Sequence, residues 1–133
     1  MSLTTTLEIR VYYEDTDFSG LVYHANYLKY FERGRTEGLR QCGFTNSDLM
    51  AREEPLVFAV RKMDLDYHLA ARMDDLLTIT TIVTEVKGAR MIFDQKAERD
   101  GVLIASAQVI VACLTPEGRP RRIPQDVISV FND

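Results

Sequence analysis

A single long helical pattern stands between one short strand pattern and four longer ones, and this order constrains the fold more than any other feature. Along residues 26–42, apolar and small residues recur at the three- and four-residue spacing of one helix face: Tyr27, Leu28, Phe31, Gly34, Gly38, Leu39 and Cys42. Gly43 is a suitable residue to end this helix. Gly34 and Gly38 each cost about 1 kcal/mol relative to alanine inside a helix, so we expect them to allow a close approach to a sheet.

Alternating apolar residues predict strands on both sides of the helix. Before it, four residues of one parity form a half-buried strand: Leu7, Ile9, Val11 and Tyr13. After it come four longer strand patterns, at residues 56–67, 75–86, 91–98 and 102–114. The phase of the first changes near Arg61–Lys62, which predicts a β-bulge, and Asp100–Gly101 predicts a tight hairpin. We interpret the four strands as a meander whose last, almost continuously apolar member is central.

The fold class that follows is α+β, with one helix packed on an antiparallel sheet. One helix covers only one face of such a sheet, so the other face or an edge strand needs a partner, and we expect an oligomer. The chain has 133 residues with no linker, repeat or low-complexity segment, and it is predicted to be one domain over residues 1–133.

Charge and hydropathy exclude several classes of protein. The net charge of −4 argues against a nucleic-acid binder, which would normally present a basic face. No apolar run approaches the roughly 20 residues that cross a bilayer, and the first residues do not resemble a signal peptide, so we expect a cytoplasmic protein. Cys42 and Cys113 stand far apart without neighbouring histidines, as is typical of buried thiols in a reducing compartment.

The residues best suited to chemistry lie between the first strand and the helix. Asp15 and Asp17 follow the strand, Gly20 allows a turn, and His24 and Asn26 lie where the helix begins. A helix N-terminus carries unpaired N–H groups and a partial positive charge. A carboxylate beside it would pair a nucleophile or general base with a donor that stabilises an oxyanion. Placement alone makes Asp17 a candidate catalytic residue, and an Asx turn is the structural alternative.

The neighbouring polar residues allow several roles. We expect Asp15 to point away from Asp17 and to be structural. His24 is a candidate general acid, a ligand contact or a hydrogen-bonding group at the helix start. His68 has no evident partner and is expected to be structural or at the surface. A divalent-metal site on Asp15, Asp17 and His24 is disfavoured because no second histidine lies nearby.

The block from Glu14 to Leu28, with the motifs Phe31-Glu32-Arg33 and Arg35-Thr36-Glu37, resembles the hotdog-fold acyl-CoA thioesterases. It is most similar to the Tol–Pal-associated branch of the hydroxybenzoyl-CoA thioesterase type. Four later positions match residues that recur in that family: Tyr67, Asp75, Gly88 and Arg90. The order of one strand, one helix and four strands is also the family's, so the resemblance covers nearly the whole chain.

This resemblance implies a hotdog fold, in which a long helix is wrapped by a curved five-stranded antiparallel sheet. It further implies that two subunits pair into one continuous larger sheet, that active sites lie at the subunit interface, and that dimers often pair into tetramers. The implied reaction is hydrolysis of an acyl-CoA thioester to free acid and CoA, without a metal or cofactor. The expected partners are therefore acyl-CoA and other copies of the chain.

The resemblance also assigns roles to residues. Asp17 matches the family's catalytic carboxylate, which acts as a nucleophile or a general base. His24 matches the helix-start position whose backbone N–H polarises the thioester carbonyl, and its imidazole is characteristic of this branch. Tyr23 and Asn26 are expected to shape the turn and contact the substrate rather than react. Phe18-Ser19 stands where smaller residues are common, which could alter the pocket near the acyl group. Four aromatic residues could line an aromatic pocket or fill the core: Phe18, Tyr23, Phe58 and Tyr67.

A basic turn between the third and fourth strand patterns is a candidate site for the phosphates of CoA. Lys87 and Arg90 flank Gly88-Ala89 there, and both side chains donate strongly to phosphate oxygens. A solvated hairpin tip is the alternative interpretation.

Two other functions fit the same fold. A hotdog hydratase or dehydratase would act on enoyl thioesters, but the chain lacks a His-Phe-Pro-type lead-in to its helix. A non-catalytic module would bind an acyl thioester or a carrier protein, although an acidic surface suits an acidic carrier protein poorly. Hydration of a crotonyl thioester without thiol release would distinguish the first alternative from a thioesterase.

Overall fold

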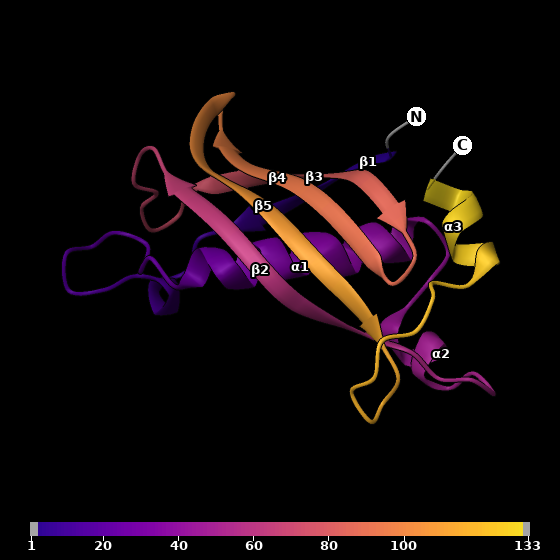
Figure 1. The fold of residues 1–133 in the computed structure, drawn as a ribbon. Coiled ribbons are helices and arrows are strands. Elements are labelled where there is room, and N and C mark those ends of the chain that lie inside the picture. Colours follow the sequence, from indigo (N-terminus) through magenta and orange to yellow (C-terminus); the bar gives the residue numbers. More distant parts are fainter. Residues whose placement is uncertain (1–2, 132–133) are drawn as a thin grey trace.

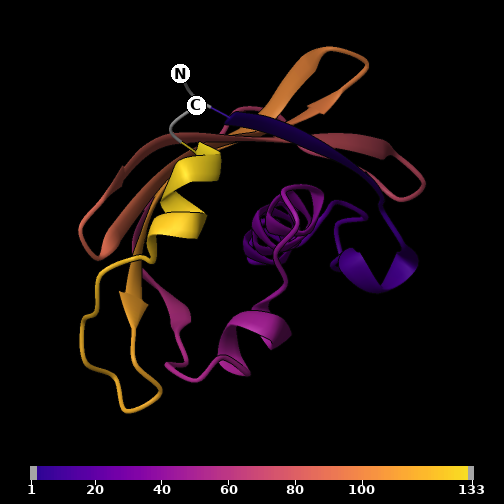
Figure 2. The same cartoon turned by 90° about the vertical axis from the view of Figure 1, so that its right-hand side faces the viewer.

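The computed structural model, which describes residues 3–131, has a curved five-stranded sheet wrapped around one long helix (Figures 1 and 2). Its elements in chain order are β1 (Leu3–Arg10), a 3₁₀ turn (Tyr13–Asp15), α1 (Asn26–Gln41), α2 (Asn46–Met50), β2 (Val57–Tyr67), β3 (Leu76–Lys87), β4 (Arg90–Arg99), β5 (Val102–Leu114) and α3 (Gln125–Phe131). All paired strands are antiparallel. The α+β prediction and the wrapped helix are confirmed.

Helix α1 packs closely against the sheet at its two glycines. A Cβ atom at Gly34 would lie 2.8 Å from Ile79 Cγ2, and one at Gly38 would lie 2.7 Å from Thr5 Oγ1. The expected close approach is confirmed, since any side chain there would push the helix off β1 and β3. The predicted face is buried except at Leu28, which is 44% exposed, and at Cys42, which is partly buried.

The order of strands in the sheet is β1-β3-β4-β5-β2, so the predicted four-strand meander is wrong for β2. Strands β3, β4 and β5 do follow one another, but β2 pairs with β5 and β1 takes the free edge of β3. A meander would require a tight turn from β2 to β3. The connection instead spans residues 68–75 and crosses the strand ends, where the amides of His68 and Leu69 donate to the Ile104 carbonyl at 2.8 and 3.1 Å.

Local features of the strands agree with the sequence. The register of β2 shifts between Val60 and Lys62, which places the predicted bulge at Arg61. Asp100 and Gly101 both have positive φ, at 52° and 79°, as a two-residue hairpin turn requires. Strand β5 lies between β4 and β2 and is interior, as expected. Two further register shifts, between Val83 and Glu85 and between Ala97 and Glu98, were not predicted.

The first strand ends earlier than its pattern predicted. Its ladder with β3 stops where Arg10 pairs with Leu76, and residues 13–15 form the 3₁₀ turn instead of further strand. The Asp15 carboxylate accepts a hydrogen bond from the Tyr12 amide at 2.8 Å, which stabilises this turn. Tyr13 is therefore 81% exposed rather than half buried.

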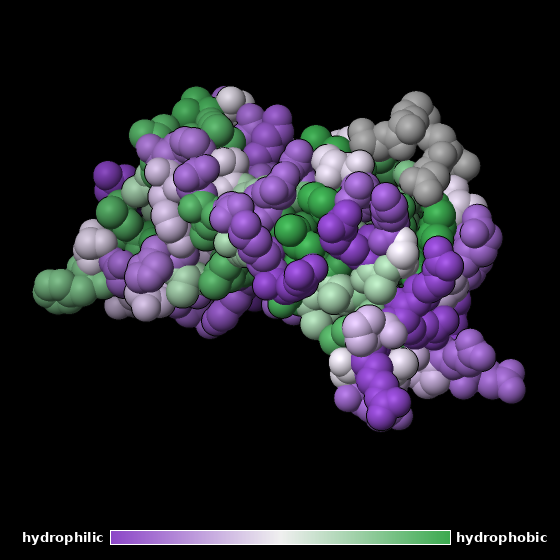
Figure 3. Space-filling model, in the orientation of Figure 1, coloured by the Kyte–Doolittle hydropathy of each residue, from purple (hydrophilic) through white to green (hydrophobic). Residues whose placement is uncertain are grey.

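Strand β2 is an edge of the sheet whose inner side is apolar and incompletely covered. Val60 and Tyr67 are 50% and 49% exposed, although they pair with the buried residues Val111 and Ala105. The outer face of the sheet, toward the viewer in Figure 3, is a mixture of hydrophilic and apolar side chains. The β2 edge therefore carries exposed apolar side chains on its inner side, and β1 is the other edge of the sheet. Within residues 3–131, no helix is long and apolar enough to cross a membrane.

Candidate active site

Asp17 lies at the base of a tight loop that leads into α1. Its amide donates to the Leu21 carbonyl at 2.9 Å, and its carbonyl accepts from the Gly20 amide at 3.0 Å. Gly20 has φ +79°, a conformation that L side chains rarely adopt. Thr16 and Val22 pair across the base of the loop. The loop therefore projects Asp17 from a backbone that is fixed on both sides.

The Asp17 carboxylate is exposed and held in an ionised form. Its Oδ1 accepts hydrogen bonds from the Ser19 hydroxyl and, at 2.9 Å, from the Ser19 amide. These two bonds, and the nearby His24, lower the pKa of Asp17 below the ordinary carboxylate value. Its Oδ2 accepts no hydrogen bond from the described residues. The Asx turn foreseen as the structural alternative is thus present, and among residues 3–131 the second carboxylate oxygen has no hydrogen-bond donor.

Asp15 has the structural role expected of it. Its carbonyl accepts from the Tyr23 amide at 2.9 Å and from Asn26 Nδ2 at 2.8 Å, while its carboxylate holds the Tyr12 amide. One residue thereby joins the end of β1, the loop and the first turn of α1. Asp15 positions the site, and Asp17 is the carboxylate left available for chemistry.

The N-terminus of α1 offers unpaired amide donors beside this loop. The helix begins at Asn26 with Ala25 as N-cap, and no side chain caps it. The amides of His24 and Ala25 donate to no acceptor within residues 3–131. Asn26 is nearly buried and its side-chain amide is bound to Asp15, so the structure shows it shaping the turn. Its predicted contact with substrate stays a prediction.

His24 is held by aromatic neighbours. Its ring lies 4.6 Å from the Tyr23 ring and 6.3 Å from the Tyr67 ring, measured between centroids. The Tyr67 hydroxyl donates to the His24 carbonyl at 2.8 Å. Tyr67 ends β2 and comes 43 positions later in the chain. Sequence analysis named it only as a possible pocket or core residue and did not predict this bond. Its recurrence in the resembled family was the signal that pointed to it.

Lys87 and Arg90 lie at the opposite end of the sheet from Asp17. Strand β3 has 12 residues from Leu76, beside the end of β1, to Lys87, which corresponds to about 36 Å. Arg90 forms a 3.0 Å ion pair with Glu85, and both side chains are partly exposed. Within one chain, the basic turn therefore does not lie next to Asp17. His68, expected to lack a partner, lies 2.9 Å from the Ser106 hydroxyl through its Nε2.

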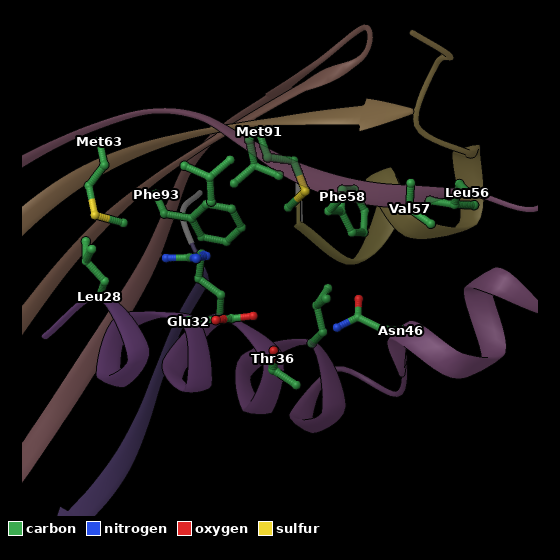
Figure 4. A pocket seen from close by; sticks show the side chains of 14 residues that line it. Leu28, Glu32, Thr36, Asn46, Leu56, Val57, Phe58, Met63, Met91 and Phe93 are labelled. Carbon is green, nitrogen blue, oxygen red and sulfur yellow. The ribbon is translucent and has the colours of Figure 1, made fainter. Parts of the chain in front are cut away.

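An apolar groove of about 690 Å³ opens between α1 and the inner side of β2, β4 and β5 (Figure 4). Its walls include Leu28, Phe58, Met63, Met91 and Phe93, and its helix side carries three polar residues, Glu32, Arg35 and Thr36. Sequence analysis named Phe58 as a possible pocket residue but not the two methionines. Phe18, named with it, is fully exposed at the loop and does not line the groove.

Comparison with known proteins identifies the family. The family model of the Thioesterase superfamily matches residues 19–105. A relative from Haemophilus influenzae, named acyl-CoA thioesterase YbgC, is 46% identical over 125 residues, which cover 93% of this chain and 91% of the relative. The chain belongs to the thioesterase superfamily.

Solved structures agree with this assignment of the chain to the thioesterase superfamily. The probable thioesterase from Bartonella henselae is 43% identical, with a TM-score of 0.89, over 92% of this chain and 100% of that chain. The 4-hydroxybenzoyl-CoA thioesterase from Pseudomonas sp. strain CBS-3 has a TM-score of 0.87 at 22% identity, over 96% of this chain and 98% of that chain. At that identity the likeness concerns the fold alone, and the hotdog prediction is confirmed.

The thioesterase match does not assign the catalytic residues. The matched range begins two residues after Asp17, so the role of this carboxylate stays a prediction based on its geometry. His24, Tyr23, Lys87 and Arg90 lie inside the matched range, but the match assigns them no roles, so their roles also stay predictions. The structure brings Asp17, Tyr23 and His24 together at one end of the sheet and leaves the two basic residues at the other.

Proposed function

We propose that this thioesterase hydrolyses acyl-CoA to a free acid and CoA. The observation that carries the proposal is an ionised, exposed carboxylate, Asp17, beside a helix N-terminus with unpaired amides. The family and the relatives named acyl-CoA thioesterases support the reaction class. No metal or cofactor is needed for this chemistry, because the carboxylate supplies the nucleophile or base and the helix supplies the oxyanion donors.

The thioester carbonyl oxygen would accept a hydrogen bond from the His24 amide, which stabilises the oxyanion as it forms. Asp17 then acts by one of two routes. Its carboxylate attacks the carbonyl carbon, expels the CoA thiolate and leaves an anhydride that water hydrolyses; alternatively it deprotonates a water that attacks the same carbon. In both routes the His24 imidazole would donate a proton to the leaving thiolate. The Tyr23 ring lies 4.6 Å from this imidazole, with 54° between the ring planes, and would orient it.

A complete site would be built between two subunits. The partly exposed inner residues and the free edge of β2 suit antiparallel pairing with the β2 edge of a second copy. The start of β2, at Val57, lies at the same end of the sheet as Arg90, because Ala112 pairs with both Ala59 and Arg90. Antiparallel pairing places this end beside the Tyr67 end of the partner. The Lys87–Arg90 turn of one subunit would then approach the Asp17 loop of the other.

In this arrangement Lys87 and Arg90 would contact substrate at the partner's Asp17 loop, which lies too far from them within their own chain. They would bind phosphates of a CoA whose thioester lies at the partner's site. We infer a dimer or a homotetramer of two such dimers, each chain a single hotdog domain. We also infer a cytoplasmic location, since Cys42 and Cys113 are both free thiols.

A thiol-release assay over short, long and aromatic acyl-CoAs tests the function directly. We expect release of CoA with stoichiometric free acid from at least one of them. Crotonyl-CoA that gains water without releasing thiol would replace hydrolysis with hydratase chemistry. Binding of acyl-CoA with no turnover of any member would indicate a non-catalytic module.

A further inference from the structure

Tyr67 reaches from the end of β2 to the first turn of α1. Its hydroxyl donates to the His24 carbonyl at 2.8 Å. The Tyr23 carbonyl, one residue earlier, accepts from the Asn26 amide at 2.8 Å, as is usual within a turn. The His24 carbonyl is held instead by a side chain that comes 43 positions later in the chain.

These two hydrogen bonds fix the peptide groups on both sides of His24. The first group joins the Tyr23 carbonyl to the His24 amide, and the second joins the His24 carbonyl to the Ala25 amide. In a trans peptide the N–H points opposite to the C=O, so holding each carbonyl also directs each amide. The two groups share the Cα atom of His24, and a rotation of the second therefore shifts the first. Neither amide has an acceptor within residues 3–131, so both are available to a ligand.

Tyr67 is itself held in place by packing. Its ring lies 5.5 Å from the Tyr27 ring and 6.3 Å from the His24 ring between centroids, both in edge-on arrangements. Tyr27 is buried, and its hydroxyl accepts from the Ala71 amide at 3.2 Å. Ala105, which pairs with Tyr67 in the sheet, is fully buried. Partial burial raises the pKa of Tyr67, so its hydroxyl remains a protonated donor.

We propose that Tyr67 is a positioning residue for thioester hydrolysis: its hydroxyl holds the peptide group after His24 and thereby directs the His24 amide at the carbonyl oxygen of the substrate. This inference rests on the proposed acyl-CoA hydrolysis, and Tyr67 acts through His24 rather than on a reacting atom. Negative charge on the substrate oxygen develops only in the transition state, so a misdirected donor lowers kcat more than it weakens substrate binding. A misplacement of about 1 Å costs about a hundredfold in rate, and loss of one of the two anchors should cost about tenfold.

The first test compares kcat and KM for one acyl-CoA in three proteins: wild type, Tyr67→Phe and Tyr30→Phe. Tyr67→Phe keeps the ring and removes only the hydroxyl. Tyr30 is the matched control, because its ring lies 5.9 Å from that of Tyr27 and its buried hydroxyl forms no hydrogen bond within residues 3–131. We expect Tyr67→Phe to lower kcat about tenfold and to change KM less than about twofold, while Tyr30→Phe keeps the kcat of wild type.

The outcomes separate this inference from the function on which it rests. An active wild type with the same kcat in Tyr67→Phe would overturn the positioning role and leave hydrolysis intact. Absence of thiol release by wild type from every acyl-CoA would refute the proposed function itself.

A second test separates positioning from a general weakening of the fold. Asp17→Asn slows hydrolysis, so infrared difference spectra can record the isotope-labelled thioester carbonyl of a bound acyl-CoA. A hydrogen bond from the His24 amide lowers the stretching frequency of this carbonyl. We expect Asp17→Asn/Tyr67→Phe to lose most of that shift and Asp17→Asn/Tyr30→Phe to keep it. An equal shift in both double variants would overturn the proposal, even if Tyr67→Phe lowers kcat.

Discussion

The two ends of the sheet both carry polar residues, but they are built in opposite ways. At the Asp17 end, side chains and backbone from separate segments are bonded to one another: Asn26 to Asp15, and Tyr67 to His24. At the other end, Arg90 contacts Glu85 on the neighbouring strand through a partly exposed ion pair. The Asp17 end is locked by hydrogen bonds between separate segments, and the Arg90 end presents charged side chains to solvent.

This difference suits two functions, stabilisation of a transition state and attraction of a charged substrate. Transition-state stabilisation requires donors and nucleophile to be fixed before the reaction, since a misplacement of about 1 Å costs about a hundredfold in rate. Attraction of a phosphate depends on charge that acts over a Debye length of about 8 Å and tolerates imprecise placement. Mutations at the locked end should therefore change kcat or folding, and mutations at the charged end should change KM.

The largest effect should come from Asp17→Asn. The amide keeps the shape of the side chain and an acceptor for Ser19, but it is neither a nucleophile nor a base. We expect kcat to fall about a hundredfold or more, with an unchanged melting temperature. Steady-state kinetics on the best acyl-CoA and a thermal melt measure the two quantities.

Asp94→Asn is the control for that variant, because Asp94 is an exposed aspartate of β4 far from the loop. It should retain wild-type kcat. If Asp17→Asn is as active as Asp94→Asn, Asp17 takes no part in the mechanism. The Asp17 end of the sheet would then not be the catalytic end.

The next largest effect is expected on stability, from Asn26→Ala. The side chain is nearly buried and its Nδ2 donates to the Asp15 carbonyl that anchors the loop. Losing a buried hydrogen bond of this kind should lower the free energy of unfolding by about 1–3 kcal/mol, measured by urea denaturation. Asn46→Ala, at an exposed position of α2, should stay within about 0.5 kcal/mol. Equal losses in both would mean that the loop is not held by Asn26.

Much of the secondary structure could be predicted from local sequence patterns. The strand pairing could not, because it depends on contacts between distant segments. The period of α1, the bulge at Arg61 and the hairpin at Asp100–Gly101 each have a signal within a few residues. The pairing of β2 with β5 has none, because any two apolar strands satisfy the same alternation. The pairing follows from the connection at residues 68–75, which crosses the strand ends and leaves β2 beside β5.

The site shows the same division. The Asp17 loop and the helix start were evident from adjacent residues, whereas the bond from Tyr67 to His24 joins positions 43 apart. Gln95 did carry a usable signal, since it is a polar residue on the buried parity of Met91, Phe93 and Ala97. A buried glutamine predicts a partner, but the sequence does not say that the partner is Arg35, whose Nη1 donates to Gln95 Oε1 at 2.9 Å.

A smaller effect is expected at the charged end, from the double variant Lys87→Ala/Arg90→Ala. KM for acyl-CoA should rise about fivefold with kcat nearly unchanged, because contacts to a remote phosphate are equal in ground and transition states. The rise should shrink at high salt. An acyl thioester truncated to lack the nucleotide should show an unchanged KM, and an equal rise for both substrates would mean that the turn supports the fold rather than CoA.

The smallest effect should come from Ser19→Ala, which tests how the locked end tunes Asp17. The Ser19 hydroxyl bonds the carboxylate and is the largest cause of its lowered pKa. The reactive form is the carboxylate, so activity is lost as pH falls through the pKa of Asp17. Removing the hydroxyl raises that pKa, and the acid limb of the kcat/KM profile should move to higher pH. The shift should be partial, because the Ser19 amide and His24 remain. Ser47→Ala, at an exposed position of α2, should leave the profile in place. An acid limb that stays fixed in Ser19→Ala would show that a group other than Asp17 controls the low-pH side.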